Sequence, residues 1–190
     1  MERAYYENKD FEKTNFTATG LAWGEYDNCT FTACNFAGVD LSGISFSDCT
    51  FRACNLATAK LGKTAFHDTI FTECKLTGLH FADCSDFLFT PHFESCTLDL
   101  SSFYGMKLKK RAFRDCSLRE VDFTGADLSG AVLHNCDLGR ALFDHTVLEK
   151  ADLRTAYNYS IDPEANRIRK ARFSAAGIIG LLDKYDIEVE

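Results

Sequence analysis

The segment Cys29-Thr-Phe-Thr-Ala-Cys-Asn-Phe-Ala-Gly38 decides the fold of this 190-residue chain. In it a large apolar residue follows a small residue by two positions, and the pair returns after five residues. A helix would return its buried face after three or four residues and a strand after two, so a step of five keeps neither element facing one way. A different architecture sets this period.

The five-residue step runs through most of the chain, and we call its large residue the centre of each repeat. The first centres are Phe11, Phe16, Leu21, Tyr26, Phe31, Phe36, Leu41, Phe46, Phe51, Leu56, Leu61, Phe66, Phe71, Leu76 and Phe81. After a shift of two residues they resume as Leu88, Phe93, Leu98, Phe103, Leu108, Phe113, Leu118, Phe123, Leu128, Leu133, Leu138, Phe143, Leu148 and Leu153. An internal repeat of this extent defines the architecture.

Small residues, mostly Cys, Thr and Ala, stand two positions before the centres. The centre and its small partner therefore both face inward, and the other three positions of each repeat hold nearly all the charge. Cys34, Cys54 and Cys74 are spaced by twenty residues, and Cys96, Cys116 and Cys136 repeat that spacing after the two-residue shift. Twenty residues are four steps of five, so the pattern predicts a four-sided coil with Cys34, Cys54 and Cys74 stacked as neighbours.

Stacked turns of this kind pair their backbones about 4.8 Å apart. The sequence therefore predicts an all-β fold, a quadrilateral β-helix of about eight coils over residues 1–160 with a two-residue insertion near 82–88. Residues 161–190 are expected to form a closing segment.

Length and composition indicate one domain with a sizeable core, since 46% of the residues are hydrophobic. The start MERAYYENKDF has no apolar signal region, and no apolar run approaches the length of a membrane span. We expect a soluble, cytoplasmic protein with no membrane partner. Its nine cysteines lack the spacing of zinc sites, so we expect free thiols that pack as small apolar residues.

Two stretches depart from the pattern. In Ser85–Pro91, Phe87 and Phe89 either fold over the local core or form an exposed contact point on the side of the rod. In Tyr104–Arg111, Met106 and Arg111 take small-residue positions, which should widen the coil or push a side chain outward, and with Arg114 and Arg119 this stretch makes a basic band from Lys107 to Arg119. We interpret this band as solvated surface.

The C-terminal segment is too apolar for a free tail. Asp162 before Pro163 favours a short helical turn, and Ser174 can cap a helix of about Ala175 to Lys184, after which Asp186–Glu190 alternates like a strand. Its apolar residues either close the open end of the β-helix or join two chains around a two-fold axis. They are Ile178, Ile179, Leu181, Leu182, Tyr185 and Ile187.

Four segments follow the order small residue, Asp or Asn, Leu or Phe, and two variable residues. They are Cys34–Gly38, Val39–Gly43, Val121–Gly125 and Ala126–Gly130. In them the chain resembles the pentapeptide-repeat family, and the resemblance covers about residues 6 to 160. It implies a right-handed, four-sided rod. Qnr-type quinolone-resistance members end in a helix and short strand that form their dimer, so the resemblance favours a homodimer through the C-terminal segment.

An enzyme is not expected, because inward side chains fill the interior and leave no obvious substrate cavity. The five histidines, His67, His80, His92, His134 and His145, fall at outward positions in no shared column, and no catalytic motif is present. We expect no catalytic, metal-binding or cofactor-binding residues. Residues 6–160 hold 21 Asp and Glu against 15 Lys and Arg, which gives little support to direct nucleic-acid binding.

The resemblance to gyrase-binding pentapeptide-repeat proteins implies the opposite relation to DNA. In those proteins an acidic rod with the girth of B-DNA occupies the DNA-binding surface of a type II topoisomerase, DNA gyrase or topoisomerase IV. The effect is protection from quinolones or toxins, or inhibition. Carboxylates would there meet the arginines and lysines that ordinarily meet phosphates.

Charge density limits this hypothesis to local mimicry. B-DNA carries about one charge per 1.7 Å, so eight coils would need roughly twenty net negative charges. The acidic residues expected to contact the partner are Glu25, Asp27, Asp40, Asp48, Asp68, Asp83, Asp86 and Asp99. Qnr proteins of the plasmid type carry two projecting loops, whereas this chain has only a two-residue bulge. The alternative function is an interaction scaffold that binds an unrelated protein through its regular faces or the Phe87/Phe89 bulge.

Overall fold

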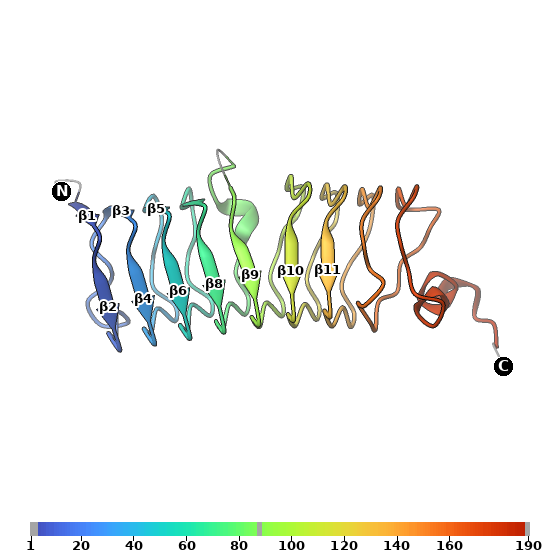
Figure 1. The fold of residues 1–190 in the computed structure, drawn as a ribbon, viewed down its shortest axis with the longest axis horizontal. Coiled ribbons are helices and arrows are strands. Elements are labelled where there is room, and N and C mark those ends of the chain that lie inside the picture. The colour runs from blue at the N-terminus through green and yellow to red at the C-terminus, as the bar shows by residue number, and fades with distance from the viewer. Residues whose placement is uncertain (1–3, 87–88, 189–190) are drawn as a thin grey trace.

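A computed structural model describes residues 4–86 and 89–188 as an elongated column of stacked turns (Figure 1). All its strand pairs are parallel and form two sheets. The first sheet holds β1 (Ala4–Glu7), β3 (Gly24–Asp27), β5 (Ser45–Ser47) and β7 (Ala65–His67). The second holds β2 (Asp10–Glu12), β4 (Thr30–Thr32), β6 (Thr50–Arg52), β8 (Ile70–Thr72), β9 (His92–Glu94), β10 (Ala112–Arg114) and β11 (Val132–His134).

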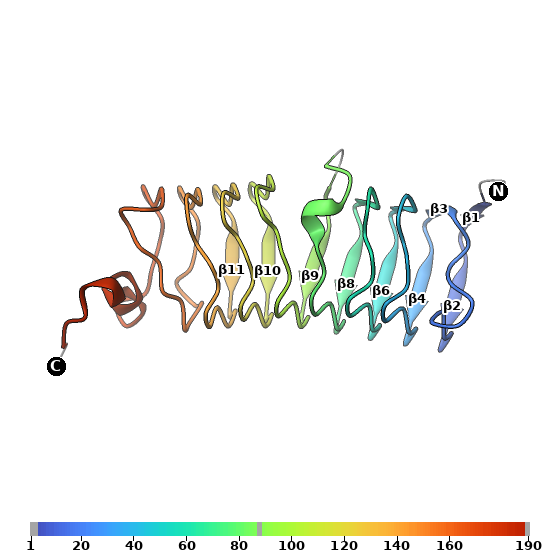
Figure 2. The ribbon, with the colours of Figure 1, turned by 180° about the vertical axis from the view of Figure 1, so that it is seen from behind.

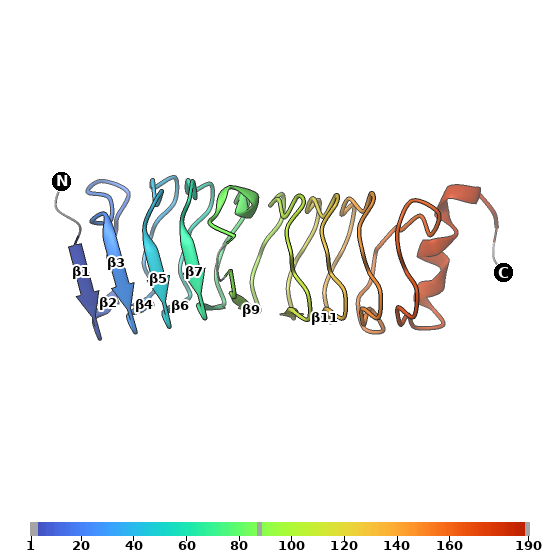
Figure 3. The same ribbon diagram turned by 90° about the horizontal axis from the view of Figure 1, so that it is seen from above.

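Each turn has four sides, as the sequence predicts. Neighbouring strands pair residues twenty apart, so that Phe31 lies opposite Phe51. We name the side with the first sheet side A and the side with the second side B (Figure 3). On sides C and D single bridges replace strands, such as Asn35–Asn55 on side C and Asp40–Lys60 on side D.

The two-residue insertion is confirmed, because Phe71 of β8 pairs with Phe93 of β9. The extra residues lie in the sequence between a short 3₁₀ helix η1 (Phe81–Asp83) and β9 (Figures 1 and 2). The seven strands of the second sheet span six steps from turn to turn, so they do not confirm the expected eight coils. Beyond β11, bridges Val132–Asp152 and Asp152–Arg172 continue the same register.

The core consists of stacked aromatic columns, because identical positions of successive turns fall one above another. On side B the rings of Phe31 and Phe51 stack with centroids 4.6 Å apart, and those of Phe51 and Phe71 5.0 Å apart. Rings on adjoining sides meet edge to face, which is the other favourable geometry for aromatic pairs. Phe and Leu centres are almost fully buried along the column.

The cysteine ladder is also confirmed. The backbone N–H of Cys34 donates to Sγ of Cys54 at 3.4 Å, and the N–H of Lys75 donates to the carbonyl of Cys54 at 2.9 Å. Each thiol also points at carbonyls, as Cys54 does at Phe31 (3.3 Å). All nine cysteines are free, and all but the half-buried Cys84 are buried. Burial raises the pKa of the Cys49 thiol to about 12.

The corners between sides use left-handed backbone conformations. At the corner after side A, Asn28, Asp48 and Asp68 have φ of 48°, 52° and 44°. Asn and Asp adopt this conformation more readily than other non-glycine residues. The repeat therefore turns its corners largely without glycine, although Gly38 and Gly43 serve elsewhere with φ of 67° and 71°.

The prediction of one C-terminal helix from Ala175 to Lys184 is wrong. The segment forms two short 3₁₀ helices, η2 (Gly177–Leu181) and η3 (Asp183–Tyr185), and Asp186–Glu188 forms no strand. Gly177 and Gly180 explain this, because glycine weakens an α-helix. Both also pack so closely on Tyr159 that a Cβ would clash with its hydroxyl or its carbonyl oxygen. Ser174 does cap the segment, accepting the N–H of Gly177 at 2.9 Å.

Among the described residues, no helix is long or apolar enough to cross a membrane.

Candidate functional site

Side A gathers carboxylates over the N-terminal half of the column. Glu25 and Asp27 lie on β3, Asp48 and Asp68 lie at the corner after β5 and β7, and Glu7 lies opposite Asp27 on β1. We name these five residues the acidic half-face. Strands β1, β3, β5 and β7 and the corner residue after each contain no Lys or Arg. The structure thus groups four of the eight predicted acids and adds Glu7, which the sequence reasoning missed.

The other four predicted acids lie elsewhere. Asp40 is on side D beside Lys60, and its hydrogen bonds from Ser42 lower its pKa. Asp83 belongs to η1, and Asp86 is exposed in the insertion. Asp99 is half-buried on side C, where it accepts the hydroxyl of Ser117 and the N–H of Arg119. Asp40 and Asp99 therefore lie on other sides than the acidic half-face, whereas the insertion that contains Asp86 continues side A, since the N–H of Ser85 donates to the carbonyl of Thr64 at 2.9 Å.

Tyr5 and His67 contact carboxylates of the acidic half-face. The Tyr5 hydroxyl lies 3.5 Å from Asp27, and desolvation together with the carboxylates of Glu7 and Asp27 raises the pKa of Tyr5. Asp68 lies 3.1 Å from the ring of His67, which adds positive charge there only when protonated. Glu7, Asp48 and Asp68 are exposed to solvent, and Glu25 and Asp27 are half-buried.

The predicted basic band is spread over three sides of the column. Lys107 and Lys110 are exposed on side A, Arg114 lies on β10 of side B, and Arg119 lies on side C. Arg111 is half-buried at its small-residue position, with Nε buried and without a hydrogen-bond partner among the described residues. Met106 packs against the core.

Of the two aromatic residues predicted at the bulge, the structure describes Phe89. Phe89 is buried and packs edge-on against Phe81 with ring centroids 6.0 Å apart. Phe87, the other residue of the proposed contact, and the expected centre Leu88 lie outside the described residues. A pocket of about 230 Å³ lies between the insertion and the following turn, lined by Ala82, Cys84, Asp86, Phe89, Tyr104, Gly105, Met106 and Lys107.

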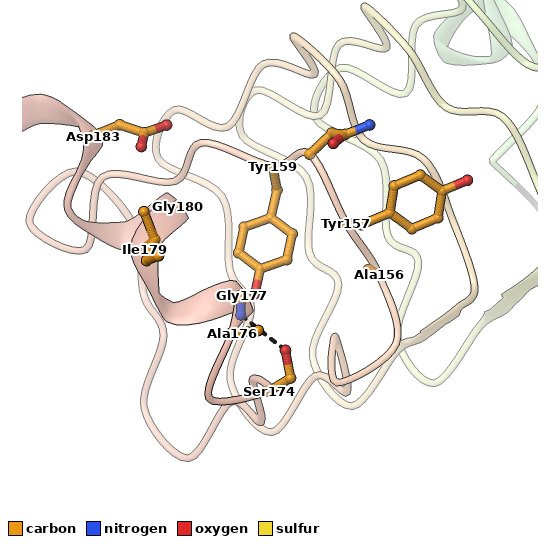
Figure 4. A pocket seen from close by; sticks show the side chains of 10 residues that line it. Ala156, Tyr157, Tyr159, Ser174, Ala176, Gly177, Ile179, Gly180 and Asp183 are labelled. Atoms are coloured by element: carbon orange, nitrogen blue, oxygen red, sulfur yellow. Dashed lines mark hydrogen bonds between the residues drawn. The ribbon is translucent and has the colours of Figure 1, made fainter. Parts of the chain in front are cut away.

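The C-terminal end carries a shallow pocket of about 500 Å³ (Figure 4). The ring of Tyr159 points toward Gly177, and that of Tyr157 points away from it. The Tyr159 hydroxyl is buried without a hydrogen-bond partner among the described residues, and burial raises its pKa. Lys184 fastens η3 to the column through Asp162 and Glu164, each at 2.7 Å.

The predicted dimer residues divide into two groups. Leu181 is buried and Leu182 half-buried, so they hold the segment onto the column. The remaining four expose about half of their surface at the end of the column, and they are Ile178, Ile179, Tyr185 and Ile187. These four side chains form an apolar terminal patch that a partner could cover.

The histidines lie apart from one another. His67 and His145 each lie next to one carboxylate, at 3.1 and 2.9 Å, and His134 lies 3.2 Å from the Thr155 hydroxyl. Within residues 4–86 and 89–188, no three His, Cys, Asp or Glu side chains gather as metal ligands would.

Solved structures with the same fold include two trypsin-treated variants of QnrB1, a plasmid-mediated fluoroquinolone resistance protein. One is 19% identical with a TM-score of 0.61 over 98% of this chain and 97% of that one. The other is 19% identical with a TM-score of 0.60 over 99% and 98%. HetL, a pentapeptide repeat protein involved in heterocyst differentiation regulation from the cyanobacterium Nostoc sp. strain PCC 7120, is 18% identical over 88% of this chain and 86% of that one, with a TM-score of 0.43. No curated protein sequence matches the chain.

Two family profiles match the sequence. The pentapeptide repeat region profile matches residues 24–89 and 44–123, and the pentapeptide repeats profile, which describes eight copies, matches residues 112–148 and 122–157. These matches extend from residue 24 to residue 157, which includes every strand from β3 to β11. The chain belongs to the pentapeptide-repeat family.

Proposed function

We propose that this protein is a non-enzymatic binding protein that modulates a type II topoisomerase by partial DNA mimicry. The acidic half-face occupies part of the DNA-binding surface of DNA gyrase or topoisomerase IV and affects the action of quinolones or toxins there. The fold that the chain shares with QnrB1 supports this proposal.

The observation that carries the proposal is the density of charge on the acidic half-face. From β1 to β7 there are three inter-strand steps of about 4.8 Å, or about 14 Å in total. Duplex DNA carries about eight phosphate charges over that length. Five carboxylates with no Lys or Arg on the same strands therefore supply more than half of the local charge of DNA.

The proposal includes a homodimer formed through the C-terminal segment. The apolar terminal patch favours a second copy of the chain at the C-terminal end, since exposed apolar side chains on a defined end of a rod are typical of interfaces. The alternative function, a scaffold for an unrelated protein through the bulge, loses support because Phe89 is buried.

The test is a gyrase supercoiling assay with and without ciprofloxacin, titrated with purified protein. The variant E25Q/D27N/D48N/D68N should need a roughly 30-fold higher concentration for the same inhibition or relief, because four carboxylate contacts of ~0.5 kcal/mol are lost. The matched control E73Q/E94Q/E120Q/D144N removes four exposed acids from the other sides and should act like the wild type. The proposal fails if the wild type has no effect at micromolar concentration, or if both variants lose activity equally.

A further inference from the structure

Side A reverses its charge along the column. The segment 106–110 stands directly before β10, as the side A segment 64–68 stands directly before β8, so 106–110 also lies on side A. The bridges Lys107–Asp127, Asp127–Val147 and Val147–Arg167 extend side A to the C-terminal end. This second half carries seven cations and two acids, Asp127 and Glu149, a net charge of +5. The cations, which we name the cationic half-face, are Lys107, Lys109, Lys110, Lys150, Arg167, Arg169 and Lys170.

Internal ion pairs neutralise only a part of this charge. Lys109 pairs with Asp127 at 3.2 Å, and Arg167 pairs with Glu149 at 2.7 Å. In the described part of the chain, no carboxylate lies within 4 Å of the other five cations. All five are exposed to solvent, and they are Lys107, Lys110, Lys150, Arg169 and Lys170.

The unpaired cations are arranged in register. Lys110, Lys150 and Lys170 occupy the same corner, with φ of 57°, 59° and 60°. The cationic half-face extends over three inter-strand steps, about 14 Å, which corresponds to about eight phosphate charges of a duplex. Rigid backbone pairing fixes these positions, as the N–H of Lys150 donates to the carbonyl of Arg169 at 3.0 Å.

We propose that the cationic half-face binds the phosphodiester backbone of duplex nucleic acid. Phosphates suit this surface because it is charged and lacks the apolar core of a protein interface. The acidic half-face does not prevent binding. The centres of the two half-faces are five turns apart, which at about 4.8 Å per turn is about 24 Å. This distance is more than two Debye lengths at 0.1 M salt, so the repulsion between the acids and the phosphates is largely screened. The proposal is independent of the topoisomerase.

The test is fluorescence anisotropy with a labelled 20-base-pair DNA duplex, without topoisomerase, between 50 and 200 mM NaCl. Five phosphate contacts give a slope of log affinity against log salt of about −4.5, so affinity should fall by roughly 500-fold over this range. The variant K110Q/K150Q/K170Q should show a slope of about −1.8 and weaker binding at 50 mM NaCl.

The matched control is K13Q/K60Q/K63Q, which removes three exposed lysines from the N-terminal half and changes the net charge equally. It should bind like the wild type, and circular dichroism checks that all variants are folded. The proposal is wrong if the wild type does not bind the duplex at 50 mM NaCl, or if the control loses as much affinity as the corner variant. Light scattering at low salt gives a further outcome that would overturn the proposal. If the wild type is then a dimer, and K110Q/K150Q/K170Q and D48N/D68N are both monomers, the cationic half-face binds the acidic half-face of a second copy.

Discussion

At the scale of single residues, Asp152 shows how outward side chains stabilise the column. Its carboxylate accepts Nε and Nη2 of Arg154 at 2.9 and 2.8 Å and Nη1 of Arg172 at 3.3 Å. Hydrogen bonding by Arg154 lowers the pKa of Asp152 to about 2. Because the pKa is lower in the folded state, this stabilisation is present above pH ~4 and is lost as the pH falls toward 2.

We therefore predict that Asp152→Asn lowers the free energy of unfolding by ~1–2 kcal/mol at pH 7. The difference from the wild type should shrink between pH 4 and pH 2, where Asp152 becomes protonated in the wild type as well. Urea unfolding followed by circular dichroism at several pH values measures both effects. Asp122→Asn is the control, because Asp122 caps the N–H of Thr124 at 2.9 Å and Asn retains that acceptor. Equal losses in the two variants would contradict the role of the arginines.

At the scale of elements, the corners are under more conformational strain than the strands. Ala33 and Ala53 adopt φ of 52° and 51°, a conformation that costs an alanine roughly 1 kcal/mol. Asn8, Asn28 and Asn135 occupy other corners with similar angles. The fold therefore accepts Asn there without other changes.

Ala53→Asn should raise the free energy of unfolding by roughly 0.5 kcal/mol, because Asn tolerates the left-handed conformation better than Ala. Ala65→Asn places the same side chain in β7, where Asn disfavours the strand, and should lower stability. Thermal unfolding of the two variants beside the wild type provides the comparison. A destabilised Ala53→Asn variant would show that corner strain does not limit stability.

The C-terminal segment shows why the sequence predicted some elements less well than others. The pattern of Ile178, Ile179, Leu181 and Leu182 indicates a helix, and it locates the apolar segment and its Ser174 cap correctly. The close packing of Gly177 and Gly180 on Tyr159 is a tertiary contact that periodicity does not report. Similarly, the pattern located the insertion, but it could not show that Phe89 turns inward onto Phe81.

At the scale of the whole molecule, the spacing of Cys34, Cys54 and Cys74 was sufficient to predict the four-sided column. A total charge count does not show the reversal of charge along side A. The net charge of residues 6–160 hides the difference between the two halves, and Arg167, Arg169 and Lys170 lie beyond that range. Assigning each outward residue to a side by its place in the twenty-residue repeat would have revealed it, because the register is strict from Phe31 to Leu133 apart from the insertion.

The terminal patch gives a prediction for the assembly. Replacing Ile178, Ile179 and Ile187 by Ser should shift a dimer to monomer, because these side chains expose 50%, 47% and 55% of their surface at the end of the column. Light scattering after size-exclusion chromatography measures the mass. The control replaces Leu100 and Leu142, which are 58% exposed on the sides, by Ser. A wild-type monomer at high micromolar concentration, or a dimer that survives the triple substitution, would contradict the proposed interface.

The twenty-residue register also limits how such a chain can lengthen or shorten. Removing twenty residues, such as 33–52, would delete one turn of the column and leave every later side chain on its own side. Removing a single five-residue repeat between Asp68 and Lys107 would preserve the alternation of centres and small residues, and hence the core. It would, however, move every later residue to the neighbouring side of the column. Lys107, Lys110 and Lys150 would then face at right angles to Asp48 and Asp68. Deletions that the core tolerates equally well can therefore differ completely in the surface that they present.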